Sequence, residues 1–378
     1  MAKVRLESLD VLRGFDLFCL VVLETILHPL AHALDSETFN RFMWCFTHVE
    51  WEGFSSWDLV MPLFLFMTGI TIPFSLSSVK RDKTLPRLPI YTRILKRFII
   101  LWIFGMICQG NLLGLDSSRI YLYSNTLQTI ALGYLVSSIL YINLKTTTQV
   151  VVSISLLLIY WALMQFASVD GYGAGDYTPT ANFAEWVDRG VLGRFRDAAT
   201  ISVDGTILFA PWYNYTWIVS SLNFVVTVMS GMFAGIILKS TNLDAIKKFK
   251  QLLFIGVTLV VIGYLLGFVH PIIKILWTSS MTLYSSGWCY ILMALFYWLI
   301  DVKGYKKHTQ LLKVYGMNSI TAYMLTIVVS FSSISQSLFH GLEQYTGSYY
   351  PFIIALSNCT IIYLILKYMY KHQVYLKV

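Results

Sequence analysis

Apolar stretches of about 20 residues alternate with short polar stretches along most of the chain. A helix of that length spans roughly 30 Å of hydrocarbon, which is the thickness of a bilayer core. Spans are predicted at residues 12–31, 57–77, 97–114, 125–142, 149–167, 215–238, 252–269, 280–300, 315–333 and 350–368. The pattern therefore predicts an all-α, polytopic transmembrane helix bundle with about 10 spans (10–11).

The polar stretches between the spans include no long linker, no low-complexity tract and no second soluble domain. Residues 1–378 are therefore predicted to form a single transmembrane domain. The longest loop, at about 167–214, contains the stretch NFAEWVDRGVLGRF, which suits a short interfacial helix. No small-residue cleavage site accompanies the first apolar stretch, so we expect a retained helix and no removable signal peptide.

Composition and charge support this picture. The chain is 56% hydrophobic and 13% charged, whereas soluble domains are about 25% charged. If both termini are cytoplasmic, 22 of the 28 Lys and Arg residues fall in cytoplasmic segments. The six in outer segments are Arg41, Arg119, Arg189, Arg194, Arg196 and Lys274. The net charge of +8 is therefore explained by anionic inner-leaflet lipid and does not indicate nucleic acid.

Cysteine spacing and known motifs exclude several other classes. The five cysteines have no paired spacing, which argues against a disulfide framework and against a CxxC metal site. The chain also lacks a Walker loop, GxGxxG, HExxH and a usable GxSxG. Soluble nucleotide machinery is therefore absent from the sequence, and no metal is expected.

Ionisable residues in the first span mark candidate function, because they are costly inside a membrane. Asp10 and Arg13 can pair on one helix face and could receive a phosphorylated cofactor, although Asp10 also suits the helix dipole. Glu24, His28 and His32 form a polar stripe along the outer half of the span. The stripe is either a hydrogen-bond ladder or a surface for substrate or protons, and a metal site would lack a recognisable third ligand.

The segment ahead of the second span concentrates polar and aromatic residues. His48 is followed by Glu50, Trp51, Glu52 and Asp58. A carboxylate that holds one imidazole nitrogen leaves the other as a base or nucleophile. The spacing of Ser55 and Asp58 is also that of a capping box, so a purely structural role for Asp58 stays open.

Three later segments repeat this theme. Lys274 and Trp277, between the seventh and eighth spans, suit either a sugar ring with an anionic substituent or a membrane-interface anchor. Gln128, near the start of the fourth span, and Asn318, at the start of the ninth, carry amides, which often lock membrane helices together.

The blocks RLESLDVLRGFDLF, HVEWEGFSSWDLVMPLFLFMTG, NTLQTIALGY, NFAEWVDRGVLG, GFVHPIIKILWTSSMTLYSSG and YGMNSITAY occur in this order. Together they resemble the heparan-α-glucosaminide N-acetyltransferase family and its bacterial relatives. The resemblance extends from about residue 5 to 330. It implies a transmembrane acyltransferase that moves an acetyl group from cytosolic acetyl-CoA to an amino sugar on the periplasmic or extracellular side.

The resemblance also implies roles for individual residues. The essential histidine of the family falls on His48, with Asp58 or Glu50 to orient it. We assign acetyl-CoA to Asp10, Arg13, Gln128 and Asn318, and the glucosamine-like acceptor to Glu24, His28, Trp51, Glu52, Lys274 and Trp277. The expected setting is the bacterial inner membrane with His48 at the outer face, and the family suggests a homodimer.

Two departures limit what carries over. Glu24 stands where the animal enzymes tend to carry asparagine, and the stretch after DRGVLG follows the family only loosely. The identity of the acceptor is therefore the least transferable part of the resemblance. A proton-coupled transporter of sugars or small molecules is the alternative, because polar stripes and Glu–His sets near the midplane are typical of such carriers.

Overall fold

The computed structural model describes residues 6–82 and 84–376. Helices make up most of this region. They are α1 (Glu7–Phe18), α2 (Glu24–Leu34), α3 (Glu37–Met43), α4 (Val60–Arg81), α5 (Leu88–Cys108), α6 (Thr126–Asn143), α7 (Thr146–Phe166), α8 (Phe183–Leu192), α9 (Ser221–Lys239), α10 (Ala245–Gly267), α11 (Ser279–Phe296), α12 (Gln310–Met317), α13 (Ser319–Val328), α14 (Ser332–Phe339), α15 (Glu343–Thr346) and α16 (Tyr350–Lys371). The strands form two short antiparallel hairpins, β1 (Ser168–Val169) with β2 (Tyr172–Gly173) and β3 (Ala199–Ile201) with β4 (Ile207–Phe209).

The prediction of an all-α membrane bundle is confirmed, whereas the count of ten spans is not. Within residues 6–82 and 84–376, eight helical segments are long and apolar enough to cross a membrane. A ninth results if α12 and α13, which meet at an angle of 77°, count as one broken span. The predicted span at 97–114 overlaps α5, and the first half of α5 carries Arg93, Lys96 and Arg97.

The orientation of the chain in the membrane stays a prediction, as does the cytoplasmic location of both termini. Four of the basic residues counted as cytoplasmic lie outside the described residues. These are Lys3, Arg5, Lys83 and Lys377.

The chain divides into two compact units, one of which consists of residues 6–48, 55–60 and 292–376. In this unit α1 continues through a π-helical turn, Cys19–Leu23, into α2, and α16 lies beside both α2 and α12. Helix α1 packs very closely on α12. A Cβ atom on Gly14 would lie 1.7 Å from the Leu312 carbonyl oxygen, and one on Gly316 would lie 1.9 Å from the Asp10 oxygen. Only glycine allows two backbones to approach this far.

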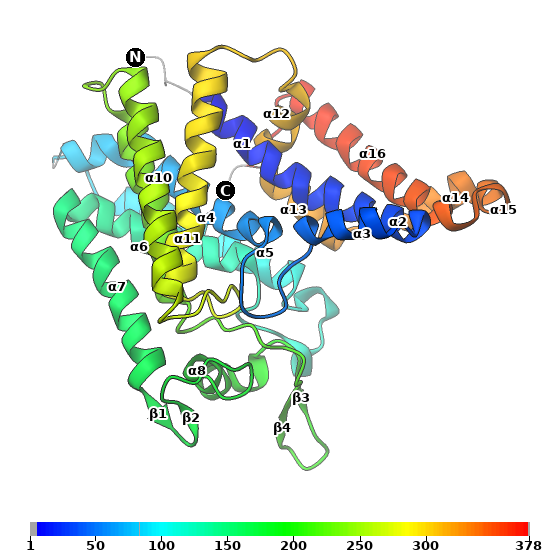
Figure 1. Ribbon diagram of the computed structural model, residues 1–378, viewed down its shortest axis with the longest axis horizontal. Coiled ribbons are helices and arrows are strands. Elements are labelled where there is room, and N and C mark those ends of the chain that lie inside the picture. Colours follow the sequence, from blue (N-terminus) through cyan, green and yellow to red (C-terminus); the bar gives the residue numbers. More distant parts are fainter. Residues whose placement is uncertain (1–5, 83, 377–378) are drawn as a thin grey trace. The chain divides into compact units, whose positions relative to one another are not determined.

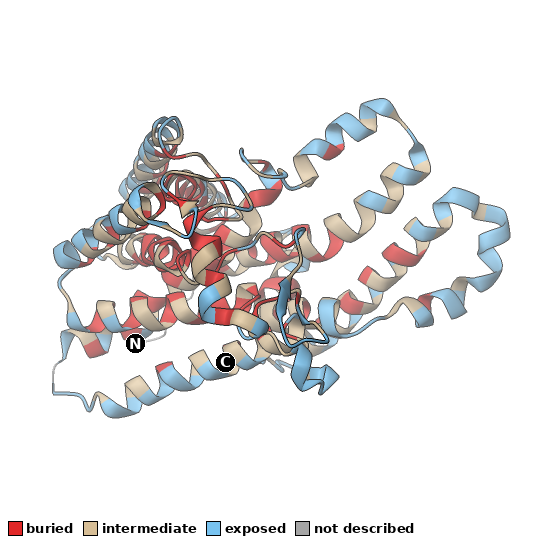
Figure 2. Cartoon of the chain, turned by 90° about the horizontal axis from the view of Figure 1, so that it is seen from below, coloured by how far each residue is buried: buried red, intermediate tan, exposed pale blue. Residues whose placement is uncertain are grey.

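The other unit holds residues 49–54 and 61–291, apart from the undescribed position 83. Helix α9 is packed by α6 and α7. Gly69 in α4 and Gly231 in α9 let these two helices meet backbone to backbone, since a Cβ on either would lie within 2 Å of a carbonyl oxygen of the other helix. Figure 2 shows that buried residues gather along particular faces of the helices while exposed residues cover the remainder.

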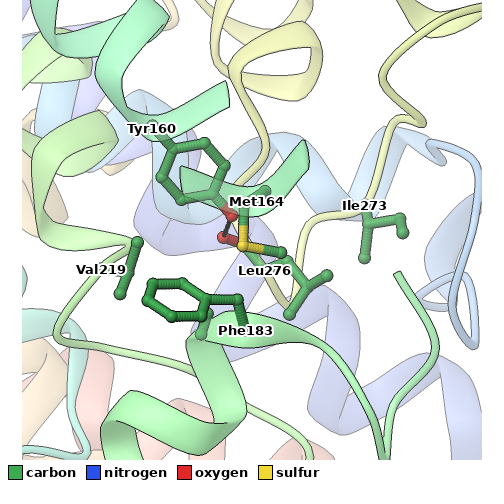
Figure 3. Packing of buried hydrophobic residues seen from close by; sticks show 7 residues of the cluster. Tyr160, Met164, Phe183, Val219, Ile273 and Leu276 are labelled. Carbon is green, nitrogen blue, oxygen red and sulfur yellow. Dashed lines mark hydrogen bonds between the residues drawn. The ribbon is translucent and has the colours of Figure 1, made fainter. Parts of the chain in front are cut away.

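The predicted outer loop folds beyond the C-terminal end of α7 (Figure 1). The short helix expected in it is α8, which is capped by Asn182, whose side chain accepts the Glu185 N–H at 2.8 Å. A hydrophobic cluster fixes α8 against α7 and the 270–278 loop (Figure 3). Its buried members are Tyr160, Met164, Phe183, Ala184, Val219, Ile273 and Leu276.

Replacing Gly14 with alanine should destabilise the protein, because the new methyl group overlaps the Leu312 carbonyl oxygen and α1 must move away from α12. We expect a cost of about 1–3 kcal/mol, measured as a lower midpoint of thermal unfolding in detergent. The control is Gly190→Ala in α8, where nothing lies within 4 Å of the added Cβ. Equal midpoints for the two variants would contradict the close approach of α1 and α12.

Candidate functional site

His48 and Asp58 lie next to one another at the start of the second predicted span. The distance between His48 Nδ1 and Asp58 Oδ1 is 2.8 Å. The Asp58 side chain is only 1% exposed, whereas that of His48 is 45% exposed. The arrangement therefore presents an accessible imidazole whose Nδ1 is held by a buried carboxylate.

A capping box holds Asp58 in this position. Its second oxygen, Oδ2, accepts a hydrogen bond from the Ser55 N–H at 2.9 Å and lies 3.1 Å from the Ser55 hydroxyl. That hydroxyl donates its proton to the Thr47 carbonyl oxygen at 2.6 Å, so the residue before His48 is held by the same group of contacts. Asp58 thus fills both roles that its spacing allowed, because one oxygen caps the helix while the other contacts His48.

This geometry determines which nitrogen of His48 can do chemistry. A carboxylate is an acceptor, so Nδ1 carries the proton of this contact, and in the neutral ring Nε2 keeps the lone pair. An imidazole in this tautomer can take a proton from an attacking amine or hydroxyl, and the carboxylate stabilises the imidazolium that results.

The residues that follow His48, Val49–Phe54, belong to the second unit and form a segment with bends at Glu50, Trp51 and Gly53. The Gly53 N–H donates to the Ile272 carbonyl oxygen at 2.9 Å, and Glu52 pairs with Ile273 in an antiparallel β-bridge. Glu50 and Glu52 are exposed, while Trp51 packs on the hydrophobic cluster. Gly53 has a φ of 125°, which explains the glycine at this place.

The two residues predicted in the 270–278 loop have different surroundings. Lys274 is half-buried. Trp277 is only 2% exposed, packs on Phe224 and donates its indole N–H to Thr227 at 3.1 Å. Trp277 is therefore a packing residue in this structure and offers no exposed platform, which corrects the expectation of a sugar contact.

The polar stripe of the first span lies on α2, where none of the eleven helical residues is buried. Glu24 is half-buried, and His28 and His32 are exposed. Within residues 6–82 and 84–376, no group of three or more His, Cys, Asp or Glu side chains is placed to hold a metal ion. The expectation that the protein needs no metal stays an expectation.

The residues assigned to the cofactor are found in two different settings. Asp10 lines a cavity of about 400 Å³ in the first unit. Asn318 marks the sharp bend between α12 and α13, and it is 2% exposed with no hydrogen-bond partner for either amide atom among the described residues. Arg13, on α1, is half-buried.

Gln128 belongs to the other unit and is fully buried in a second capping box. Its Oε1 accepts the N–H groups of Ser124 and Asn125, and its Nε2 donates to the Leu122 carbonyl oxygen at 2.6 Å. The amide is therefore committed to the backbone, and the structure gives Gln128 a local role at the start of α6 in place of the expected cofactor contact.

Sequence reasoning missed several buried polar residues. Asp16 lies in α1, is 2% exposed, and its Oδ2 has no hydrogen-bond partner among the residues described. Its presence inside an apolar span was the signal that could have found it.

The outer loop contains a buried ionic cluster that sequence reasoning also missed. Arg196, fully buried, contacts Glu185 at 2.5 Å, and Asp188 accepts the N–H groups of Trp217 and Ile218. Burial raises the pKa of Asp188 to about 7. Nothing in the local sequence distinguishes these charges from the exposed charges of a loop.

The helices are those of a membrane protein, and Asp58 orients His48. Comparison with known proteins shows which proteins the chain is similar to. Residues 5–177 match a family model described as "Domain of unknown function (DUF5009)". The heparan-alpha-glucosaminide N-acetyltransferase of Mus musculus is 26% identical over 331 residues, which cover 74% of this chain and 49% of the relative. That of Homo sapiens is 26% identical over 368 residues, 85% of this chain and 52% of the relative.

The chain spans about half the length of the curated relatives it matches. The similarity to the human relative nevertheless covers 85% of this chain. The part that matches the family model includes the His48–Asp58 segment. The resemblance deduced from the sequence blocks is confirmed: the chain is related to the heparan-α-glucosaminide N-acetyltransferase family.

If Asp58 orients His48, then Asp58→Asn should lower the activity of the protein far more than Ser55→Ala does. The first change removes the carboxylate charge that stabilises the imidazolium, and the second weakens the capping box while the carboxylate remains. We expect a loss of roughly 10²-fold or more in kcat for Asp58→Asn and a small loss for Ser55→Ala, measured by steady-state kinetics. Equal losses would mean that Asp58 acts as a helix cap alone.

Proposed function

We propose that this chain is a transmembrane acetyltransferase that uses cytosolic acetyl-CoA and acetylates the amino group of a glucosamine-like sugar on the outer side. The observation that carries the proposal is the 2.8 Å contact between His48 and Asp58 in a chain related to N-acetyltransferases. The charge distribution supports a bacterial inner-membrane location with His48 at the outer face.

His48 acts in this proposal as the general base. The amine of the acceptor attacks the thioester carbonyl carbon, a C–N bond forms, and the C–S bond breaks. His48 Nε2 takes the proton that the amine loses and returns it to the departing thiolate, so that the products are an amide and a free thiol. Asp58 holds the ring in the tautomer that this requires and stabilises the imidazolium.

We assign the acceptor to residues that follow His48 along the chain. Glu50 and Glu52 are both exposed, and two carboxylates suit the ammonium form of an amino sugar. Lys274 follows Ile273, the bridge partner of Glu52, and suits an anionic substituent on that sugar. The exposed His28 and the half-buried Glu24 on α2 are further candidates for contact with the acceptor.

The donor is assigned to the cavity of the first unit. Its lining residues are Glu7, Asp10, Lys313, Met317, Tyr370, Lys371, Gln373 and Tyr375. Lys306 and Lys313 already stabilise an anion here, since their ammonium groups lie 3.1 and 3.2 Å from the Glu7 carboxylate. Lysines suit the phosphates of coenzyme A and tyrosine rings suit its adenine.

The amide of Asn318 adds support for the donor site, because it directly follows Met317 of the cavity lining and lacks a hydrogen-bond partner among the described residues. Buried polar groups are normally paired, so an unpaired amide beside a cavity fits a ligand that is bound during turnover. We assign Asp10, which lines the cavity, and Arg13, three residues further along α1, to the same donor site.

The central test of the proposal is acetyl transfer from labelled acetyl-CoA to a panel of amino sugars by detergent-purified protein. Removing the base in His48→Ala should lower turnover by roughly 10²–10⁴-fold. The matched control is His308→Ala, which removes an exposed histidine outside the site. Full activity of His48→Ala would disprove the role of His48, and proton-coupled sugar uptake without transfer would favour a transporter.

The donor assignment predicts a change in KM. The double variant Lys313→Ala with Lys371→Ala removes two positive charges from the cavity and should raise the KM for acetyl-CoA by about 10-fold or more. The variant Lys247→Ala with Lys250→Ala removes the same charge from α10 and serves as the control. An equal KM for both double variants would move the donor site away from this cavity.

A further inference from the structure

A hydrogen bond from Trp51 holds the segment Val49–Phe54 to the loop that contains Tyr177. Trp51 donates its indole N–H to the carbonyl oxygen of Tyr177 at 3.0 Å. Tyr177 follows the β1–β2 hairpin of the outer loop, and its hydroxyl lies 2.9 Å from Nδ1 of His270. All three residues belong to the same unit of the protein. They connect the segment to two other parts of the outer surface.

The hydrogen bonds of His270 specify its protonation state. The Ser279 N–H donates to His270 Nε2 at 3.0 Å, so this nitrogen keeps its lone pair. The ring proton therefore lies on Nδ1 and is donated to the Tyr177 hydroxyl, which can in turn donate to Gln165 Oε1 at 3.3 Å. His270 is fully buried, and burial lowers its pKa to about 4, which keeps the ring neutral.

This neutral, buried histidine cannot serve as an accessible catalytic base, because both of its nitrogens are engaged. It does fix the position of the Tyr177 ring, with which it makes an edge-on contact at 5.2 Å between centroids. An anchored Tyr177 ring fixes the carbonyl oxygen that receives Trp51. The ring of Trp51 also packs against the hydrophobic cluster drawn in Figure 3.

The Val49–Phe54 segment connects His48 to Ser55, the residue that caps the helix and contacts Asp58. His48 directly precedes Val49, and Ser55, which bonds to Asp58, directly follows Phe54. Only six residues separate these ends, so the path of the segment restrains the backbone at both. A misplacement of about 1 Å at a catalytic group can cost on the order of 10²-fold in rate.

We propose that Tyr177 and His270 are positioning residues, which hold the Val49–Phe54 segment through Trp51 and thereby set the backbone that carries His48. This inference rests on the proposed function for its catalytic consequence. The hydrogen-bonded relay from Ser279 through His270 and Tyr177 to Trp51 stands on the geometry itself. Neither Tyr177 nor His270 touches the acceptor in this assignment.

The first test compares Tyr177→Phe with Tyr172→Phe. The first variant removes the hydroxyl that receives the His270 proton, and the second removes a hydroxyl of the same hairpin that contacts Arg189 at 3.2 Å. Hydrogen exchange reports on the Gly53 amide, which donates to Ile272, and steady-state kinetics report on turnover. Thermal unfolding serves to check that both variants are folded.

We expect Tyr177→Phe to speed exchange across residues 49–54 and to lower kcat by roughly 10- to 100-fold, with an unchanged KM for acetyl-CoA. Tyr172→Phe should behave as the wild type in all three measurements.

A second pair of variants distinguishes the hydrogen bond at Nδ1 of His270 from the one at Nε2. His270→Asn can still donate from the Nδ1 position and should retain more protection of the segment than His270→Gln, which cannot.

Exchange across residues 49–54 that is equal in Tyr177→Phe and Tyr172→Phe would overturn the inference, and so would faster exchange with unchanged kcat. Failure of the proposed function has a different signature. If the wild type transfers no acetyl group to any acceptor, kcat cannot be compared between the variants. The exchange measurement still decides whether Tyr177 and His270 hold the segment.

Discussion

The structure of the candidate site depends on one carboxylate that contacts both a histidine and a helix cap. Asp58 is nearly inaccessible to water and yet contacts both His48 and the Ser55 cap. A buried carboxylate is costly unless its oxygens are hydrogen-bonded, so the cap and the histidine are both needed to hold it. The same requirement gives His48 a defined tautomer. The start of the helix and the orientation of His48 are therefore coupled at a single side chain.

A similar constraint applies to the buried polar residues of the loops. Polar groups of the loops are buried against helices that must also face lipid, and they therefore need internal partners. Arg196 donates from Nη2 to Glu185 and to the Tyr213 carbonyl oxygen, and both ring nitrogens of His270 have hydrogen-bond partners. The Val49–Phe54 segment, which directly follows His48, is held to Tyr177 of the loop by the hydrogen bond from Trp51.

The sequence predicted the helical membrane class and the pairing of His48 with a nearby acid, because hydrophobic period and short-range spacing are local properties. It was less successful for side chains whose role depends on distant neighbours. Gln128 looked like a cofactor residue and is a cap, and Trp277 looked like a platform and is packed inside. The predicted span at 97–114 overlaps a helix whose first half is charged, and the ninth predicted span is broken at Asn318.

The sequence by itself determined which segments are apolar, that Ser55 and Asp58 have the spacing of a capping box, and which family the chain resembles, since each follows from residues that are close along the chain. Only the tertiary structure decided that Trp51, Tyr177 and His270 act together, because more than 200 residues separate the first from the last. It also decided that Gly14 and Gly316 bring two helices into backbone contact. Such contacts depend on how helices pack, and packing is not encoded in any local pattern.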